Sequence, residues 1–182
     1  RRGQERGPIQ PLPAPAMTRP DIRIRPATDA DGGDLARVIA TIFTDYPNCN
    51  FIPDEFPELD APASHYAGRG GRLWIAEAAS ETVGSFAVTG TPQPGVFELF
   101  KVYLLPQCRG GGTAQAMLSE AVSLAEAAGG HQLRLWTDTR FAEGHRFYER
   151  NGFVRVPGSR AVPDGSATWE YAYTRTLAPP VP

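Results

Sequence analysis

Apolar and polar residues recur along the chain with two periods, which predict strands in some segments and helices in others. Residues 22–25 alternate with the two-residue period of a half-buried strand, which Pro26 ends. A helix is predicted next, from an N-cap at Thr28 with an acidic partner at Asp31 to about Phe43. Its apolar face consists of residues at helical spacing: Leu35, Val38, Ile39 and Ile42.

Residues 45–60 break both periods and predict a long irregular loop. The segment holds three prolines and mixes aromatic with acidic residues, namely Asp45, Tyr46, Phe51, Asp54, Glu55, Phe56, Glu58 and Asp60. Loops of this length inside a compact domain are often functional. A short helix is predicted directly after it, over residues 61–67.

The second half of the chain alternates strands with helices. Strands are predicted over residues 73–77, 82–89, 97–105, 133–137, 153–156 and 168–177. Helices are predicted from Gly112 to the Gly129-Gly130 pair and over residues 142–151. The element order is therefore β-α-α-β-β-β-α-β-α-β-β, which indicates a mixed α+β domain and not a doubly wound parallel sheet.

The composition fits a single globular domain. The chain has 182 residues, and 41% of them are hydrophobic, which is enough for a sizeable core. Residues 1–20 are rich in Pro, Arg, Gly and Gln and are predicted to be a flexible tail, either a tag or an extension, with Met17 as a candidate start. The folded domain is expected over residues 21–177, with a short C-terminal tail at 178–182.

Charge and cysteine content exclude several classes of function. The net charge of -2 gives no basic footprint for a nucleic-acid partner. No apolar run approaches the roughly 20 residues that span a membrane, and no signal peptide is recognisable. Cys49 and Cys108 lack metal-ligand spacing, so reduced thiols, no metal site and a cytoplasmic location are predicted. Lys101 is the only lysine among many arginines, which is typical of a GC-rich bacterial genome.

Residues 106–114 join the most apolar strand candidate to a helix and contain three consecutive glycines. Glycines let the backbone turn tightly and leave several N–H groups uncovered. The helix that follows adds its own unpaired N–H groups and the positive end of its dipole, which suits a phosphate. A nucleoside-triphosphate loop would need a lysine here, and a G-x-G-x-x-G site would need glycine where Gln115 stands. A phosphate socket and a turn that binds nothing both stay open.

The same segment resembles the acetyl-CoA motif R/Q-x-x-G-x-G/A of the GNAT acetyltransferase superfamily, with Arg109, Gly112 and Ala114 at the matching positions. A second family motif, F-Y-x-x-x-G-F, is present at residues 147–153, and residues 24–31 resemble the usual opening of the family. The resemblance covers residues 21–177. It implies a central, mostly antiparallel sheet that splays in a V between its fourth and fifth strands, flanked by helices.

The resemblance implies acetyl-CoA as co-substrate and assigns residues to it. The backbone from Arg109 to Ala114 would hold the pyrophosphate, and the main chain of residues 102–104 would pair with the pantetheine arm as an added strand does. Many members carry an asparagine before the tyrosine of the second motif, where this chain has Phe141. The predicted cofactor-binding residues are Val102, Tyr103, Leu104, Arg109, Gly110, Gly111, Gly112, Thr113 and Ala114.

The resemblance also implies direct acyl transfer to an amine, with two catalytic side chains. Tyr148 would be the general acid, because a phenol can protonate the CoA thiolate as it leaves. Glu98, or a chain of water molecules, would be the general base that takes the proton of the attacking amine. A tyrosine that only packs a helix on the sheet, and a solvated glutamate at a strand start, are the alternatives for these two residues. His145 is expected to be a surface histidine.

The acceptor pocket is expected between the loop at 45–60, the pair His65 and Tyr66, and the loop at 157–168. Acids in the first loop favour a cationic amine by charge complementarity, although they also serve to keep a surface loop soluble. A small-molecule amine is preferred over a protein amine. A non-catalytic acyl-CoA sensor, a longer acyl donor and a domain without CoA remain alternatives. Because the family often dimerises through its C-terminal strands, a homodimer is a further expectation.

Overall fold

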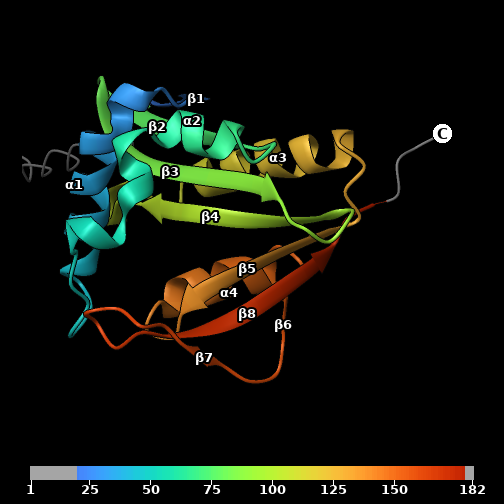
Figure 1. Cartoon of the computed structure of the whole chain (residues 1–182). Coiled ribbons are helices and arrows are strands. Elements are labelled where there is room, and N and C mark those ends of the chain that lie inside the picture. Colours follow the sequence, from blue (N-terminus) through green and yellow to red (C-terminus); the bar gives the residue numbers. More distant parts are fainter. Residues whose placement is uncertain (1–19, 179–182) are drawn as a thin grey trace, which may run out of the picture.

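The computed structural model describes residues 20–178, and its centre is one eight-stranded sheet (Figure 1). The tails predicted at either end lie almost wholly outside the described residues. The strands are β1 (Ile22–Pro26), β2 (Arg72–Ala78), β3 (Glu81–Gly90), β4 (Val96–Leu104), β5 (Gln132–Asp138), β6 (Val154–Arg155), β7 (Arg160–Ala161) and β8 (Trp169–Thr176). They are ordered β1-β2-β3-β4-β5-β8-β6, with β7 paired to β8.

Helices cover both faces of this sheet (Figure 1). They are α1 (Gly32–Phe43), α2 (Pro62–Ala67), α3 (Thr113–Ala127) and α4 (Ala142–Arg150). The apolar sides of α1 and α2 form a core with Leu73 and Ala87, while α3 and α4 pack on the other face with Leu99, Leu133 and Leu135. Within the described residues, no helix is both long and apolar enough to cross a bilayer.

The predicted V-shaped opening lies between β4 and β5. These two strands are parallel and pair only from Val96–Gln132 to Leu99–Leu135, while the other strand pairs are antiparallel. Beyond Leu99 the two strands separate, as Figure 1 shows. An extra residue in β4, opposite the Ser85–Ala87 step of β3, makes a bulge at Lys101, whose φ is 51°. The upper part of β4 therefore keeps one edge open.

The element order expected from the periodicity is confirmed. The structure adds short elements in segments rich in proline and polar residues, where no periodicity predicted them. The long loop contains two 3₁₀ turns, Pro53–Glu55 and Pro57–Asp60, each begun by a proline. The first helix is preceded by a 3₁₀ turn, Asp29–Asp31, which Thr28 caps. In addition, the C-terminal loop forms the short strand β7 against β8.

Candidate active site

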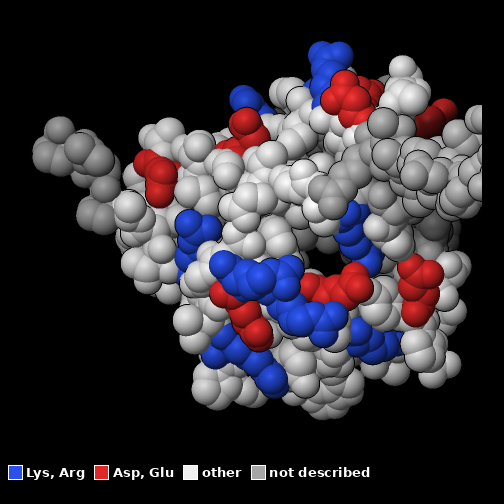
Figure 2. Space-filling view, turned by 180° about the vertical axis from the view of Figure 1, so that it is seen from behind, with Lys and Arg blue, Asp and Glu red and all other residues white. Residues whose placement is uncertain are grey.

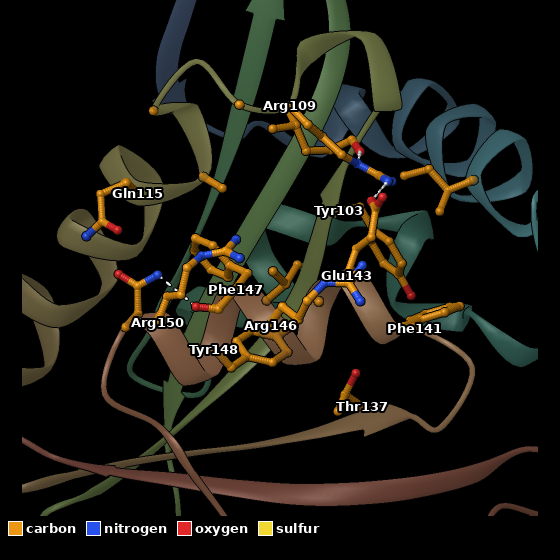
Figure 3. Close-up of a pocket in the computed structure, with 18 of the residues that line it drawn as sticks. Tyr103, Arg109, Gln115, Thr137, Phe141, Glu143, Arg146, Phe147, Tyr148 and Arg150 are labelled. Carbon is orange, nitrogen blue, oxygen red and sulfur yellow. Dashed lines mark hydrogen bonds and ion pairs between the residues drawn. The ribbon is translucent and has the colours of Figure 1, made fainter.

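A cleft of about 710 Å³ opens beside the free edge of β4 (Figure 3). One wall is the end of β4 with the glycine-rich turn, and the opposite wall is α4. Seven of the nine predicted cofactor-binding residues line it: Val102, Tyr103, Leu104, Arg109, Gly110, Gly112 and Ala114. Gly111 and Thr113 lie in the same turn but do not contribute to the lining.

The glycine-rich turn is shaped by two backbone angles that favour glycine. Gly110 and Gly112 have φ values of 75° and 89°, and Gly112 is the N-cap of α3. A Cβ added to either glycine would meet no atom within 4 Å, so the space beside both is open. The first turn of α3, whose leading N–H groups have no partner within the helix, therefore begins at this open space.

Arg109 lies across the mouth of the cleft. Its Nε donates to the Leu104 carbonyl at 2.9 Å, and its Nη1 donates to the Glu143 carboxylate of α4 at 2.5 Å. Figure 3 shows both contacts as dashed lines. The sequence motif places Arg109 at the cleft, as expected, but its guanidinium is held by protein groups on both sides.

Two basic side chains on the α4 wall were not found from the sequence. Arg146 and Arg150, one helical turn apart, line the cleft, and Figure 3 shows them on its side of α4. Within residues 20–178 neither forms an ion pair. Figure 2 shows basic and acidic groups gathered around a hollow on this side of the molecule. The sequence contained a signal for them, because Arg146 and Arg150 flank the Phe-Tyr pair of the second motif four residues apart and so share one face of the helix.

A second, smaller cavity of about 280 Å³ adjoins the cleft. Its walls come from β4, β5, the 45–60 loop and the 157–168 loop, so both loops expected at the acceptor site contribute. His65 and Tyr66 do not line it, and Tyr66 is instead buried against Phe100. Five residues line both spaces and mark where they meet: Val102, Tyr103, Thr137, Phe141 and Tyr148.

Tyr148 occupies this junction with its ring packed between Phe147, Phe153 and Tyr173. Only 5% of the residue is exposed, and its hydroxyl has no hydrogen-bond partner among the described residues. Every fully buried side-chain polar atom in that part of the chain has a partner, so the Tyr148 hydroxyl must reach the open cavity. Burial, with a smaller effect of Tyr173, raises the pKa of Tyr148 above its ordinary value and keeps it protonated at neutral pH.

Phe141 and Tyr103 complete the junction. Phe141 stands where many GNAT members have asparagine, and its ring packs on Tyr46 and Phe43, with centroids 4.6 and 6.0 Å away. The Tyr103 ring meets Phe43 edge-on. Burial raises the pKa of Tyr103, and the neighbouring Tyr148 adds to this effect. Aromatic rings therefore form this side of the junction.

Glu98 is not brought to the junction. It lies opposite Arg134 in the β4–β5 register, and its Oε2 accepts a hydrogen bond from Arg134 Nε at 2.6 Å. Neither the cleft nor the smaller cavity is lined by Glu98. Its role as the base stays a prediction.

Hydrogen bonds hold the 45–60 loop and the 157–168 loop together over the smaller cavity. Arg140 binds the Asp138 carboxylate and donates to the Asn48 carbonyl at 2.9 Å and to Thr168 at 3.0 Å. A second bridge runs from the Asn50 N–H to the Ser166 hydroxyl at 2.9 Å. The contacts of Arg140 with Asn48 and of Asn50 with Ser166 span more than ninety positions in the sequence, which is why periodicity and motifs did not reveal them.

The remaining candidate side chains have structural positions. His145 is half-buried, not on the surface as expected, because its Nε2 lies 2.9 Å from the Asp138 carbonyl and its ring stacks on Tyr173. Burial lowers the pKa of His145. Cys49 and Cys108 are free and buried, and burial raises the pKa of Cys49 to about 11. Among residues 20–178 no cluster of His, Cys, Asp or Glu is placed to hold a metal ion.

Comparisons with known proteins agree with this geometry. A family model described as Acetyltransferase (GNAT) domain matches residues 69–155, which include β4, the glycine-rich turn and α4. The Escherichia coli K12 protein named uncharacterized N-acetyltransferase YjgM is 29% identical over 150 residues, which cover 79% of this chain and 84% of that protein.

Solved structures share the fold. An acetyltransferase of the GNAT family from Staphylococcus aureus Mu50 superposes with a TM-score of 0.74 at 21% identity, over 87% of this chain and 100% of that one. The PaiA N-acetyltransferase of Thermoplasma acidophilum, solved in complex with coenzyme A, gives a TM-score of 0.67 at 18% identity, over 86% and 99% of the two chains. With the splayed sheet, the glycine-rich turn and both sequence motifs in place, the match over residues 69–155 identifies a GNAT acetyltransferase domain in this chain, and the protein is an acyltransferase.

Proposed function

We propose that the protein transfers the acetyl group of acetyl-CoA to a primary amine of a small molecule. One observation carries this proposal: the cleft with the glycine-rich turn and the smaller cavity meet at Tyr148, whose hydroxyl has no hydrogen-bond partner among the described residues and reaches the open space. A reaction between two substrates needs two adjoining spaces and a proton-transferring group where they join. The smaller cavity is enclosed by fastened loops, which favours a small amine over the amine of a folded protein.

The cleft has the groups that CoA would require. The N–H groups at the start of α3 and the open positions beside Gly110 and Gly112 suit the pyrophosphate. Arg146 and Arg150 supply positive charge on the opposite wall. For the pantetheine arm we propose the main chain of Val102 and Tyr103, because the Leu104 carbonyl already accepts from Arg109.

In the proposed reaction the amine nitrogen attacks the thioester carbonyl, a C–N bond forms, and the C–S bond breaks as the tetrahedral intermediate collapses. Tyr148 donates its proton to the departing sulfur, and its raised pKa ensures that the proton is present before this step. The amine must lose one proton in the course of the reaction. Since the Glu98 carboxylate is bound by Arg134 outside both spaces, any transfer from the amine to Glu98 would run through water.

The first experiment is thermal unfolding with and without acetyl-CoA, on the wild type and on Gly112→Trp. A ligand that binds only the folded state raises the midpoint by an amount set by its affinity. We expect a rise in the wild type that is lost in Gly112→Trp, whose indole would fill the open space beside the turn. No rise at millimolar acetyl-CoA would overturn the proposal.

The second experiment measures CoA release from acetyl-CoA over a panel of small amines, for the wild type and Tyr148→Phe. We expect release with at least one amine, and a loss of about 10²- to 10⁴-fold in kcat for Tyr148→Phe, as removal of a general acid causes. Binding of acetyl-CoA without release, over the whole panel, would instead support a non-catalytic sensor.

A further inference from the structure

The smaller cavity, which the proposed function assigns to the acceptor amine, has an uneven distribution of charge. Four carboxylates line it: Glu55, Asp138, Asp164 and Glu170. Two of them are neutralised by arginines, because Arg140 binds Asp138 at 2.7 Å and Arg160 binds Glu170 at 2.8 Å. Within the described residues, the other two form no ion pair.

These two carboxylates, Glu55 and Asp164, come from different loops but lie close together. The Glu55 Oε1 accepts a hydrogen bond from the N–H of Gly165, the residue after Asp164, at 2.7 Å. The loops approach so closely here that a Cβ on Gly165 would lie 2.2 Å from Ile52 Cδ1. Neither acid is among the five residues that line both spaces, so the pair lies away from the junction with the cleft.

Asp164 is ionised at neutral pH. Burial opposes its charge, but hydrogen bonds from Thr168 and Ser166 outweigh burial and lower the pKa of the Asp164 carboxyl. The cavity contains one lysine, Lys101, and its ammonium is bound to Glu58. Arg140, which binds Asp138, also helps to lower the pKa of Asp164, but within the described residues neither Asp164 nor Glu55 forms an ion pair.

Between the two ends the cavity is aromatic. Tyr148 lies at the junction with the cleft; it is 5% exposed, and its hydroxyl has no hydrogen-bond partner among the described residues. The middle is walled by Phe43, Phe56, Phe100 and Trp136. At roughly 30 Å³ per water-sized group, a space of about 280 Å³ holds on the order of ten non-hydrogen atoms.

We propose that the acceptor is a short dicationic amine, in which an apolar linker joins the reacting amine to a second positive group. The reacting amine lies at Tyr148, the linker lies against the aromatic wall, and the second cation lies at Glu55 and Asp164. This inference rests on the proposed function and narrows its substrate to the diamine class.

Diaminobutane and butylamine test the proposal, because they have the same carbon chain and differ in the second charge. Their binding to the CoA-saturated protein is measured by calorimetry. We expect diaminobutane to bind at least about tenfold more tightly, because its second ammonium group forms charge-assisted hydrogen bonds with the two acids. Added salt should weaken diaminobutane more than butylamine.

Variants locate the second charge. Glu55→Gln and Asp164→Asn keep the oxygens that accept from Gly165, Ser166 and Thr168, so the loops keep their hydrogen bonds. We expect either variant to remove most of the preference for diaminobutane and to leave butylamine unchanged. Asp54→Asn is the control, because Asp54 is exposed, adjoins Glu55 and does not line the cavity.

Equal affinity of the wild type for the two amines would overturn the proposal, as would an equal loss of preference in Asp54→Asn. CoA release distinguishes this failure from failure of the proposed function. Amines acetylated without any diamine preference would overturn the diamine inference and leave the transferase proposal standing. A diamine preference in binding, without acetylation of any amine, would overturn the transferase proposal and leave the cavity as a binding site for diamines.

Discussion

Arg109 and Glu143 join the two walls at the mouth of the larger cleft by an ion pair, with Nη1 and Oε2 2.5 Å apart. The pair joins the glycine-rich turn to α4, the two walls between which the cofactor is proposed to lie. The same guanidinium donates to the Leu104 carbonyl, so Arg109 has protein partners on two sides. An anionic ligand in the cleft therefore competes with Glu143 for this arginine.

We expect Glu143→Gln to bind CoA more tightly than the wild type. Removing the carboxylate frees Arg109 for phosphate oxygens and takes away a negative charge near them. Because Glu143 is 60% exposed, its pair with Arg109 is worth only about 0.2–1 kcal/mol, so the dissociation constant should fall by no more than about fivefold. Calorimetry measures this. Glu126→Gln, at the end of α3, serves as the control, and weaker CoA binding by Glu143→Gln would mean that Glu143 orients Arg109 for the ligand.

The two arginines on α4 give a second prediction. We expect Arg146→Gln and Arg150→Gln each to weaken CoA binding by about tenfold, the value of a charge-assisted hydrogen bond to phosphate. Dephospho-CoA, which lacks the ribose phosphate, separates the phosphates: the variant whose arginine binds that group will lose no further affinity for this analogue. Arg155→Gln is the matched control, because Arg155 stacks on Tyr171, with its guanidinium carbon 3.4 Å from the ring centroid, and does not line the cleft. An equal loss in Arg155→Gln would indicate only a general effect of net charge.

The order of elements and the glycine-rich turn could be predicted from the sequence because both depend on neighbouring residues. Helical spacing from Leu35 to Ile42 and the positive φ of Gly112 are local properties. The ion pair of Glu98 with Arg134 is different, since it depends on the β4–β5 register that brings positions 98 and 134 together. Arg140 likewise binds the carbonyl of Asn48 only because two loops fold over one cavity. Sequence motifs therefore predicted which residues lie at the site. They could not predict the ion-pair and hydrogen-bond partners of charged side chains, because those partners are brought together by long-range packing.

The Arg25–Asp31 pair at the start of α1 predicts a pH dependence of stability. A hydrogen bond from Arg25, against an opposing effect of burial, lowers the pKa of Asp31 from 3.8 to about 2. Because the folded pKa lies below the unfolded value, the contribution is fully present above about pH 4 and is lost as pH falls toward 2. We expect Asp31→Asn to cost about 2 kcal/mol of unfolding free energy at pH 7 and almost nothing near pH 2. Urea unfolding at both pH values measures this, and a cost that is equal at the two values would contradict it.

Glu98 and Tyr148 differ in their surroundings, and their variants should differ in activity. Tyr148 lies where the cleft and the smaller cavity meet, whereas the Glu98 carboxylate is 13% exposed, bound by Arg134 and outside the lining of both. We therefore expect Glu98→Gln to lower kcat/KM by less than about tenfold, well short of the 10²- to 10⁴-fold loss that removal of a general acid or base causes. The measurement is the pH profile of kcat/KM with saturating acetyl-CoA. A loss of about 10²-fold or more, together with disappearance of the acidic limb of that profile, would instead make Glu98 the base and require a water path from the amine. Glu98→Asp is the matched control, because the shorter acid keeps the charge, and only a catalytic role predicts that it restores the limb that Gln removes.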